Sequence, residues 1–351
     1  MKTVNLEFEK LRFLHCGLGQ YCLNLADSFS SIEQSDFKLQ FMVNSQANTS
    51  LLNDSCKFQS LHKIHRKFNF LAPSADLWHI INQDSRYMPP SSRIPLLLTV
   101  HDLNFLYTKT SSRKIKKRLS DLQKKVDRAA HVTVISESTH ADLLAHCNVN
   151  VPITVISNGV TLGEPSASAP AYYPNAEFIF SIADITEKKN FHVLLKLLVE
   201  LPHVYLIIAG NKQNVYAKYL QDYAKELNVS SRLILPGIVS EEEKSWLYHH
   251  CQLFCSPSLA EGFGLPVVEA LLCNKPILLS DLPAHREHAK EWASYFESYD
   301  PASMREVYVR CLKEYDQRSL QLKHRLSEHL QRFTWKQCAQ RYLDVYRDIL
   351  N

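Results

Sequence analysis

Two acidic residues flank a glycine-rich turn in the second half of this 351-residue chain. Residues 258–272 read SLAEGFGLPVVEALL, in which Gly262 and Gly264 lie between Glu261 and Glu269. Glycines let a backbone approach phosphate oxygens without a Cβ in the way, and the N-terminus of a following helix attracts an anion. A carboxylate repels phosphate but accepts hydrogen bonds from hydroxyl groups. The pattern therefore predicts a site for a diphosphate flanked by two hydroxylated rings.

These residues require a strand-to-helix turn at the edge of a sheet. Residues 252–258 read as a strand, and a helix is expected after Pro266, which suits a first turn because its missing N–H is not needed there. Ligands of parallel sheets bind beyond the carboxyl ends of the strands. We therefore expect Glu261 to bind a sugar and Glu269, about one turn into the helix, to bind a ribose diol.

Short β-type runs alternate with helical segments along most of the chain, which predicts βα units on parallel sheets. The runs are nearly continuously apolar, as in strands that are covered on both faces. The expected strands are residues 37–43, 76–82, 95–102, 131–136, 152–157, 177–183, 204–210, 232–237, 252–258 and 275–281. Only a short strand is possible before residue 17, so the N-terminal edge of the first sheet is expected to be abbreviated.

The length of the chain favours two domains, because single cores stop growing below this size. Residues 164–176 are rich in Pro, Ala and Ser, lack periodicity and are expected to be a linker. The predicted domains are residues 1–163 and 177–332. A last helix over residues 333–351 is expected to pack back toward the first domain.

Composition points to a cytoplasmic protein. Hydrophobic residues make up 45% of the chain, but none of their runs is long enough to cross a bilayer. The N-terminal residues carry charges throughout and lack the apolar region of a secretory signal. Nine cysteines without paired spacing suit reduced thiols better than a disulfide framework.

A basic amphipathic helix is expected over residues 109–128, where cations far outnumber the two acids. Two interpretations stay open. The charges form a solvated helix face, or they rest on anionic lipid headgroups and hold the protein at the inner face of a membrane. Nucleic acid is not an expected partner, because no aromatic-interleaved basic motif accompanies the cluster.

The segment EGFGLPVVEA, residues 261–270, resembles the E-x7-E signature of the retaining family 4 glycosyltransferases. The resemblance implies the GT-B fold, in which two Rossmann-like doubly wound α/β domains face each other across a cleft. It also implies transfer of a sugar from a nucleoside diphosphate sugar, such as GDP-mannose or UDP-glucose, to a glycan or lipid-linked acceptor hydroxyl with retention of configuration. No metal or other cofactor is expected, in agreement with the absence of an obvious Asp-x-Asp motif.

Further segments of the second half resemble the same family. FIFSIADITEKKNFHVLL, residues 178–195, is similar to the start of the donor domain, where a lysine that matches Lys189 contacts the donor phosphates. RLILPGIVSEEE, residues 232–243, is similar to the segment whose backbone holds the nucleotide base. The donor-binding residues implied here are Gly237, Ile238, Gly262, Phe263, Gly264, Leu265 and Glu269.

The first half carries two further similarities. GLGQY resembles the family's N-terminal glycine-rich loop, in which amides at Gly17 to Gly19 face the donor diphosphate, although such a pair of glycines can also be a plain turn. LLLTVHDLNFLY resembles the His-Asp segment, which implies that His101 lies beside the transferred sugar. A lone histidine is also often structural, so that alternative stays open. The expected catalytic residues are His101, Lys189 and Glu261.

One departure from the family pattern supports a different class of function. The family often has Gly-Arg where this chain has Ala183 and Asp184, and that arginine is a second phosphate contact. The alternative is a catalytically inactive GT-B protein that binds a nucleotide sugar or a glycan. Neither a zinc site at residues 249–255 nor a nicotinamide site is expected, because the spacing of the required residues fits neither.

Overall fold

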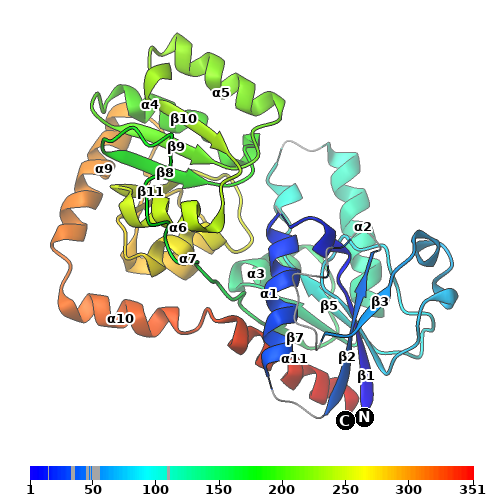
Figure 1. Cartoon of the computed structure of the whole chain (residues 1–351). Coiled ribbons are helices and arrows are strands. Elements are labelled where there is room, and N and C mark those ends of the chain that lie inside the picture. The colour runs from blue at the N-terminus through cyan, green and yellow to red at the C-terminus, as the bar shows by residue number, and fades with distance from the viewer. Residues whose placement is uncertain (15, 33–35, 45–46, 48, 50–55, 109–110) are drawn as a thin grey trace. The chain divides into compact units, whose positions relative to one another are not determined.

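The structure, a computed structural model, describes residues 1–14, 16–32, 36–44, 47, 49, 56–108 and 111–351 (Figure 1). The chain divides after Gly159 and again after Gln331. Unit 1 comprises Met1–Gly159 and Arg332–Asn351, and unit 2 comprises Val160–Gln331. Each unit is built on one parallel sheet with helices, which confirms the predicted class of two α/β domains. The predicted cleft between them stays a prediction.

The described strands of unit 1 form a parallel sheet in the order β3-β2-β1-β4-β5-β6-β7. The strands are β1 (Lys2–Glu7), β2 (Phe37–Val43), β3 (Phe58–Ser60), β4 (Leu77–Ile80), β5 (Leu96–Val100), β6 (His131–Val134) and β7 (Ile153–Val155). The expectation of an abbreviated N-terminal edge is wrong, because β1 lies in the middle of the sheet and pairs with both β2 and β4. The order of the strands reverses between β1 and β4, where open α/β sheets bind their ligands.

Helices cover both faces of this sheet. Unit 1 contains α1 (Gly17–Ser31), α2 (Ser112–Arg128), α3 (Glu137–His146) and α11 (Trp335–Leu350), together with the 3-10 helices η1 (Glu9–Arg12), η3 (Lys63–Arg66), η4 (Asn69–Leu71) and η5 (Asn104–Leu106). Alternate side chains of β5 enter different cores, because successive residues of a strand point to opposite faces. Leu97 packs in the core that includes residues of α1 and α11, and Leu98 packs in the core that includes residues of α2 and α3.

A chain of buried hydrogen bonds connects α11 to the centre of this sheet. The His79 ring bonds to the Tyr346 hydroxyl and to Thr99 Oγ1, each at 2.8 Å. Thr99 also lies 3.2 Å from the Tyr342 hydroxyl, which accepts a hydrogen bond from the Tyr21 hydroxyl at 2.7 Å. The C-terminal helix is thereby fixed by polar bonds as well as by apolar contacts.

Unit 1 is expected to lose stability in acid through His79. Burial lowers the pKa of His79 to about 3, whereas a histidine of an unfolded chain titrates near 6.5. As the pH falls from about 6.5 toward 3, the unfolded chain binds a proton that the folded unit does not, so the unfolding free energy falls by about 1.4 kcal/mol per pH unit for this residue. Urea unfolding of the wild type and of His79→Gln at several pH values measures the difference.

Other buried groups also titrate between about pH 3 and 7. The contribution of His79 is therefore the difference in pH dependence between the wild type and His79→Gln. His101 acts in the same direction, since burial lowers its pKa to about 4. Glu7 acts in the opposite direction, since burial raises its pKa to about 7 and the folded unit keeps a proton that the unfolded chain loses above about pH 4.5. Equal pH slopes in the wild type and His79→Gln would show that His79 is not a buried neutral group.

The described strands of unit 2 form a second parallel sheet, in the order β10-β9-β8-β11-β12-β13. The strands are β8 (Phe178–Ile182), β9 (Tyr205–Ala209), β10 (Leu233–Gly237), β11 (Leu253–Ser256), β12 (Ile277–Leu279) and β13 (Ser294–Tyr295). The helices are α4 (His192–Val199), α5 (Val215–Glu226), α6 (Glu241–His250), α7 (Leu265–Leu272), α8 (Pro283–Ala289), α9 (Pro301–Asp316) and α10 (Leu320–Leu330), with the 3-10 helices η6 (Glu187–Lys189), η7 (Ser230–Arg232) and η8 (Lys290–Trp292). All ten strands predicted from the sequence are confirmed, and the order of this sheet reverses between β8 and β11.

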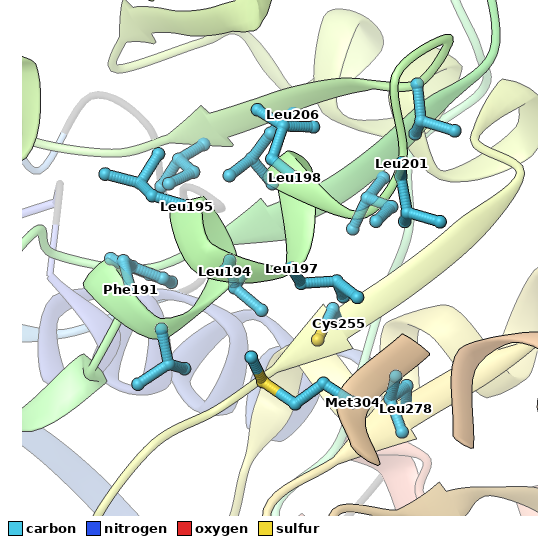
Figure 2. Packing of buried hydrophobic residues seen from close by; sticks show 14 of the residues in the cluster. Phe191, Leu194, Leu195, Leu197, Leu198, Leu201, Leu206, Cys255, Leu278 and Met304 are labelled. Carbon is cyan, nitrogen blue, oxygen red and sulfur yellow. The ribbon is translucent and has the colours of Figure 1, made fainter. Parts of the chain in front are cut away.

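Helix α4 is nearly all apolar, and its side chains form the centre of one core of unit 2 (Figure 2). Leu195, Leu197 and Leu198 are fully buried in this core. Met304 of α9 and Leu278 of β12 pack in the same cluster. The burial of α4 fixes the position of the loop that precedes it, and that loop contains Lys189.

The segment expected to be a linker, residues 164–176, contains neither a helix nor a strand. It belongs to unit 2, in which Tyr173 contacts the rings of Phe178 and Trp246. The Ser166 amide also donates to the Glu242 carbonyl at 3.1 Å.

The basic segment forms α2 from residue 112 onward, while residues 109 and 110 lie outside the described part of the chain. Leu122 and Val126 turn into the core, and several cations have protein partners. Arg118 pairs with Asp84 at 2.9 Å, and Lys125 donates to the Gln83 carbonyl. None of the described helices is both long enough and apolar enough to span a bilayer.

Candidate functional site

The carboxyl ends of β8 and β11 bring together two residues that were predicted to act in catalysis. These strands are neighbours where the order of the second sheet reverses, so the loops that follow them meet at one edge. Lys189 lies in the loop after β8, and Glu261 lies in the loop after β11. Lys189 Nζ and Glu261 Oε1 are 2.5 Å apart, and the two side chains are only 11% and 12% exposed.

The local backbone explains the position of Lys189. Residues 187–189 form η6, which ends at Asn190 in the left-handed conformation, with φ of 57°. The buried helix α4 follows directly and prevents the loop from moving outward. Between the two loops, the Leu259 amide donates to the Lys188 carbonyl at 2.8 Å. Main-chain bonding thus holds the two loops together independently of the ion pair.

The ion pair fixes the charge state of Glu261. Burial acts to raise the pKa of Glu261, but the charge of Lys189, the nearby His285 and hydrogen bonds lower it to about 2. Glu261 is therefore ionised at neutral pH. An ionised carboxylate accepts hydrogen bonds and cannot donate a proton, so this side chain is suited to bind hydroxyl groups.

The turn before α7 has the geometry that the sequence predicts for a glycine-rich ligand turn. Gly264 adopts φ of +83° and ψ of 51°, a left-handed conformation that disfavours other residues, and it precedes the first residue of the helix, Leu265. The carbonyl of Gly264 accepts the Val267 amide at 2.9 Å. Phe263 is buried and its ring lies 4.2 Å from that of His288. Phe263 therefore packs the turn against helix α8.

His285 is a residue of this region that the sequence interpretation left out. It is fully buried on α8, and its Nδ1 lies 2.9 Å from the Ser280 carbonyl, to which it donates. Its Nε2 has no hydrogen-bond partner among the described residues and would lie 3.8 Å from a Cβ built on Gly264. Burial lowers the pKa of His285, so Nε2 is an unprotonated acceptor beside the turn. No sequence signal separates this histidine from an ordinary structural one.

Glu269, the second acid of the signature, contacts helix α6. Its Oε1 lies 3.0 Å from Lys244 Nζ, and its Oε2 accepts a hydrogen bond from the Tyr248 hydroxyl at 2.7 Å. Burial acts to lower the pKa of Lys244, but Glu269 and Glu241 raise it overall. The sequence interpretation did not identify Lys244 or Tyr248. Because a carboxylate oxygen accepts more than one hydrogen bond, Glu269 keeps the capacity to bind a hydroxyl group as well.

The predicted base-binding residues lie at the carboxyl end of β10. Gly237 ends this strand with φ of +99°, and its carbonyl accepts the Gly210 amide at 2.8 Å. Ile238 follows and is 56% exposed. An exposed apolar side chain beside a strand end can pack against a flat ring. Lys212 is a further cation here, since its Cε would lie 3.4 Å from a Cβ on Gly237.

In unit 1, the structure places Gly17 and Gly19 inside the first turn of α1 rather than in a loop before it. Gly19 must be glycine, because a Cβ there would lie 2.0 Å from the carbonyl oxygen of Phe13. The Gly19 amide donates to the Cys16 carbonyl at 2.9 Å, whereas Gly17 is exposed. Fewer than the three amides of residues 17–19 are therefore free to bind an anion. The contact of this segment with the donor diphosphate stays a prediction.

His101 follows β5 and is buried against its neighbours. Its Nε2 lies 2.7 Å from the Ile81 carbonyl, and its amide donates to Gln83 Oε1 at 3.0 Å. The Tyr21 ring lies 4.7 Å from the His101 ring, edge to face. Burial lowers the pKa of His101 to about 4, so the ring is neutral. These contacts give His101 a structural role, while its place beside a transferred sugar stays a prediction.

Glu7 is a second residue that the sequence interpretation missed. It ends β1 next to the point where the order of the first sheet reverses, and it is 1% exposed. Its Oε1 accepts the Glu9 amide at 3.0 Å, and burial raises its pKa to about 7. Within the described residues, no group of three or more His, Cys, Asp or Glu side chains is placed to hold a metal ion. The expectation that no metal is needed stays a prediction.

Comparison with known proteins connects this geometry to a family. Residues 63–164 match the family described as Glycosyltransferase Family 4, and residues 168–329 match Glycosyl transferases group 1. The two matches support a glycosyltransferase of the family 4 type. The structure of this glycosyltransferase is similar to that of sucrose-phosphate synthase from Thermosynechococcus elongatus, with a TM-score of 0.78 and 16% identity over 99% of both chains. The fold is thus GT-B.

Two relatives of this glycosyltransferase carry names that state a reaction. It is 28% identical over 216 residues to the O-antigen chain mannosyltransferase RfbU of Salmonella typhimurium, an alignment that covers 60% of each chain. The chain therefore spans about three fifths of the length of that relative. It is 25% identical over 288 residues to the GDP-mannose:cellobiosyl-diphosphopolyprenol alpha-mannosyltransferase of Xanthomonas oryzae, which covers 79% of this chain and 75% of the relative.

Proposed function

We propose that this chain transfers a hexose from a nucleoside diphosphate sugar to a hydroxyl group of a glycan or lipid-linked acceptor. The transfer retains the configuration of the sugar and needs no metal. The two family matches and the two named mannosyltransferases support the class of reaction. The contact between Lys189 and Glu261 where the order of the second sheet reverses is the observation that carries the proposal.

The chemistry of the two residues suits the departure of a diphosphate. Lys189 neutralises the negative charge that develops on the leaving group, and a preorganised cation in a poorly hydrated site does this more effectively than water. Because Glu261 has a pKa of about 2, it does not protonate the leaving oxygen. It binds hydroxyl groups of the transferred sugar instead. Lys189 is already paired with Glu261 before a donor binds, so the donor phosphates compete with Glu261 for an ordered ammonium group.

The remaining roles follow the same division of labour. The turn at Gly262, Phe263, Gly264 and Leu265 receives the diphosphate, Gly237 and Ile238 hold the base, and Glu269 binds the ribose. In unit 1 the proposal keeps the start of α1 at Gly17 and Gly19 for the diphosphate, with the Gly17 amide as the donor, and His101 for the transferred sugar. A phosphate oxygen accepts the proton of the acceptor hydroxyl, as the family resemblance implies.

A donor screen tests the proposal. Thermal unfolding is followed with a panel of nucleoside diphosphate sugars, since a ligand that binds only the folded state raises its stability. GDP-mannose is the first candidate because both named relatives are mannosyltransferases, and UDP-glucose is the second. Donors that stabilise the protein are then tested for transfer and for slow hydrolysis. A protein that binds none of these donors would contradict the proposed site.

Asp184 supports a second candidate function. It is exposed after β8, where an arginine would add a phosphate contact. In this alternative, the protein binds a nucleotide sugar or a glycan and does not turn it over. Tight donor binding with neither transfer nor hydrolysis for any donor would favour the alternative. Restored turnover in Asp184→Arg would show that this position alone limits activity.

Replacing Glu269 with alanine is expected to weaken nucleotide binding about tenfold or more, because hydrogen bonds to a charged group contribute about 1.5–3 kcal/mol. Glu241→Ala is the matched control, since Glu241 shares the Lys244 ammonium at 2.6 Å but is 57% exposed. Titration calorimetry with the nucleoside diphosphate measures both variants. Equal affinity in the wild type and Glu269→Ala would remove Glu269 from the binding site.

A further inference from the structure

A short segment of unit 1 exposes large apolar side chains that the proposed reaction does not use. Residues 61–72 connect β3 to β4 and include η3 and η4. Phe70 is 67% exposed, Leu71 51%, Ile64 50% and Phe68 40%. The other exposed large apolar residues of the described chain are spread over both units, and a soluble protein ordinarily exposes some of them. A cluster of this kind marks an interaction surface.

The exposure is built into the fold, because the segment is held at both ends. Leu61 and Ala72 are buried in the core beneath the sheet, and the Leu61 amide donates to the Val43 carbonyl at 2.7 Å. Asn69 Nδ2 donates to the Pro89 carbonyl at 2.8 Å. The chain is thus fixed on either side of the exposed residues. The apolar side chains between these anchors cannot turn inward without breaking these bonds.

The charges around these side chains have one sign. From Lys57 to Ala75 the sequence contains no acidic residue. Lys57, Lys63 and Lys67 are exposed, and none of them forms an ion pair with another described residue. Lys67 Nζ lies 5.5 Å from the centre of the Phe68 ring. The surface therefore combines apolar tips with a rim of free ammonium groups.

The neighbouring 3-10 helix extends the same character. Arg66 forms an ion pair with Glu9 of η1, and Arg12 pairs with the same carboxylate at 2.7 Å. Because Glu9 is buried, its negative charge contributes little at the protein surface. Phe13 lies next to η1 and is 47% exposed, with the Arg12 guanidinium 4.4 Å from its ring centre. Cations and aromatic rings thus continue from η3 to η1.

We propose that residues 61–72, with Phe13 beside them, form a membrane-docking surface that inserts Phe70, Leu71, Ile64 and Phe68 into an anionic lipid bilayer. Aromatic and aliphatic side chains enter the interface, and lysines at their base attract anionic headgroups. A protein partner is a weaker fit, because the segment is a projecting loop with cations alone rather than a flat surface of mixed charge. Docking does not depend on the proposed sugar transfer.

Helix α2 is the competing surface, and its geometry suits lipid less well. Its apolar residues Leu122 and Val126 are buried, and Ile115 and Leu119 pack against the same core, so this helix offers mainly charge to a bilayer. Arg113 and Lys117 are exposed and provide a fair comparison. Electrostatic attraction alone is screened by salt, whereas insertion of apolar side chains persists. The two surfaces therefore differ in their response to ionic strength.

Sedimentation with vesicles tests the proposal on the whole chain. Vesicles of phosphatidylcholine are compared with vesicles that also contain phosphatidylglycerol. The wild type is expected to bind the anionic vesicles, and Phe70→Ser with Leu71→Ser is expected to lower partitioning about tenfold or more. Lys63→Ser with Lys67→Ser lowers binding to the anionic vesicles alone. The pair Val215→Ser with Leu320→Ser, which removes exposed apolar residues of unit 2, leaves binding unchanged.

Several outcomes would overturn the proposal. They are wild-type binding that ignores lipid charge, equal binding by Phe70→Ser with Leu71→Ser, and an equal loss in Arg113→Ser with Lys117→Ser of α2. Concentration-dependent self-association that disappears in the Phe70 and Leu71 variant, without vesicle binding, would assign the surface to a second copy of the chain. Lys189→Ala is expected to bind vesicles like the wild type, so failure of the donor site and failure of docking are separable.

Discussion

Replacing Lys189 with alanine is expected to lower kcat by about 100- to 1000-fold, the range for loss of one preorganised group that stabilises a developing negative charge. The variant also leaves the Glu261 carboxylate without its ammonium partner in a site where that side chain is 12% exposed. The pKa of Glu261 then rises from about 2, because only His285 and the hydrogen bond with Ser258 still oppose the effect of burial. Steady-state kinetics over a range of pH measure both effects.

Lys225→Ala is the control for this experiment. Lys225 is a surface lysine of α5 whose side chain is 70% exposed and pairs with Asp222 alone among the described residues, so its loss should change neither kcat nor KM. Donor binding by Lys189→Ala, measured separately, shows whether the loss belongs to turnover or to affinity. A kcat within about threefold of the wild type would remove Lys189 from the mechanism, since that difference corresponds to less than 1 kcal/mol.

Replacing Tyr342 with alanine is expected to lower the unfolding free energy of unit 1 by about 3–5 kcal/mol, as for other large buried rings. Tyr342 is fully buried on α11, and its hydroxyl bonds to Tyr21 and Thr99. Tyr342→Phe keeps the ring and removes the hydroxyl, so it should cost about 1–2 kcal/mol. Urea unfolding followed by circular dichroism measures these differences.

Arg341→Ala is the matched control, because this neighbour on α11 is exposed and surface substitutions usually change stability by less than about 0.5 kcal/mol. Unit 2 does not contain Tyr342, so its own unfolding should be unchanged. Unfolding in two steps, of which only one shifts, is the expected pattern. An unchanged midpoint in Tyr342→Ala would show that α11 does not contribute to the core of unit 1.

Much of the fold could be predicted because buried parallel strands are continuously apolar, and all ten such runs became strands. The central strand β1 was harder to recognise, since Asn5 and Glu7 interrupt its apolar pattern. Both are buried, and Asn5 donates to the Pro73 carbonyl at 3.1 Å. In β1, tertiary hydrogen bonds thus stabilise buried polar residues, and these residues break the apolar pattern expected of a buried strand. Strands β3 and β13, of three and two residues, contain polar residues and so lack the continuous apolar run that marks the other short strands.

The candidate site was predicted in part for a similar reason. The glycine-rich turn and Lys189 are local features next to strand ends, which a sequence shows directly. The contacts of Glu269 with Lys244 and Tyr248 depend on how α6 packs beside α7, and sequence spacing does not determine that packing. His285 was left out of the predicted site because the sequence does not separate a site histidine from a structural one, and only its burial beside Gly264 distinguishes it. Contacts that depend on the packing of helices could therefore not be predicted from local features at the ends of strands.

The return of α11 to unit 1 has a consequence for synthesis on the ribosome. Unit 2 is one continuous stretch of chain, whereas unit 1 needs residues 332–351 in addition to the first 159. Domains generally fold as they emerge, so the later-translated unit 2 can finish folding first. Until α11 has been synthesised, Tyr21 and His79 of the nascent unit 1 lack their hydrogen-bond partners on that helix. Translation pauses late in the message would lengthen that exposed interval and favour capture by chaperones.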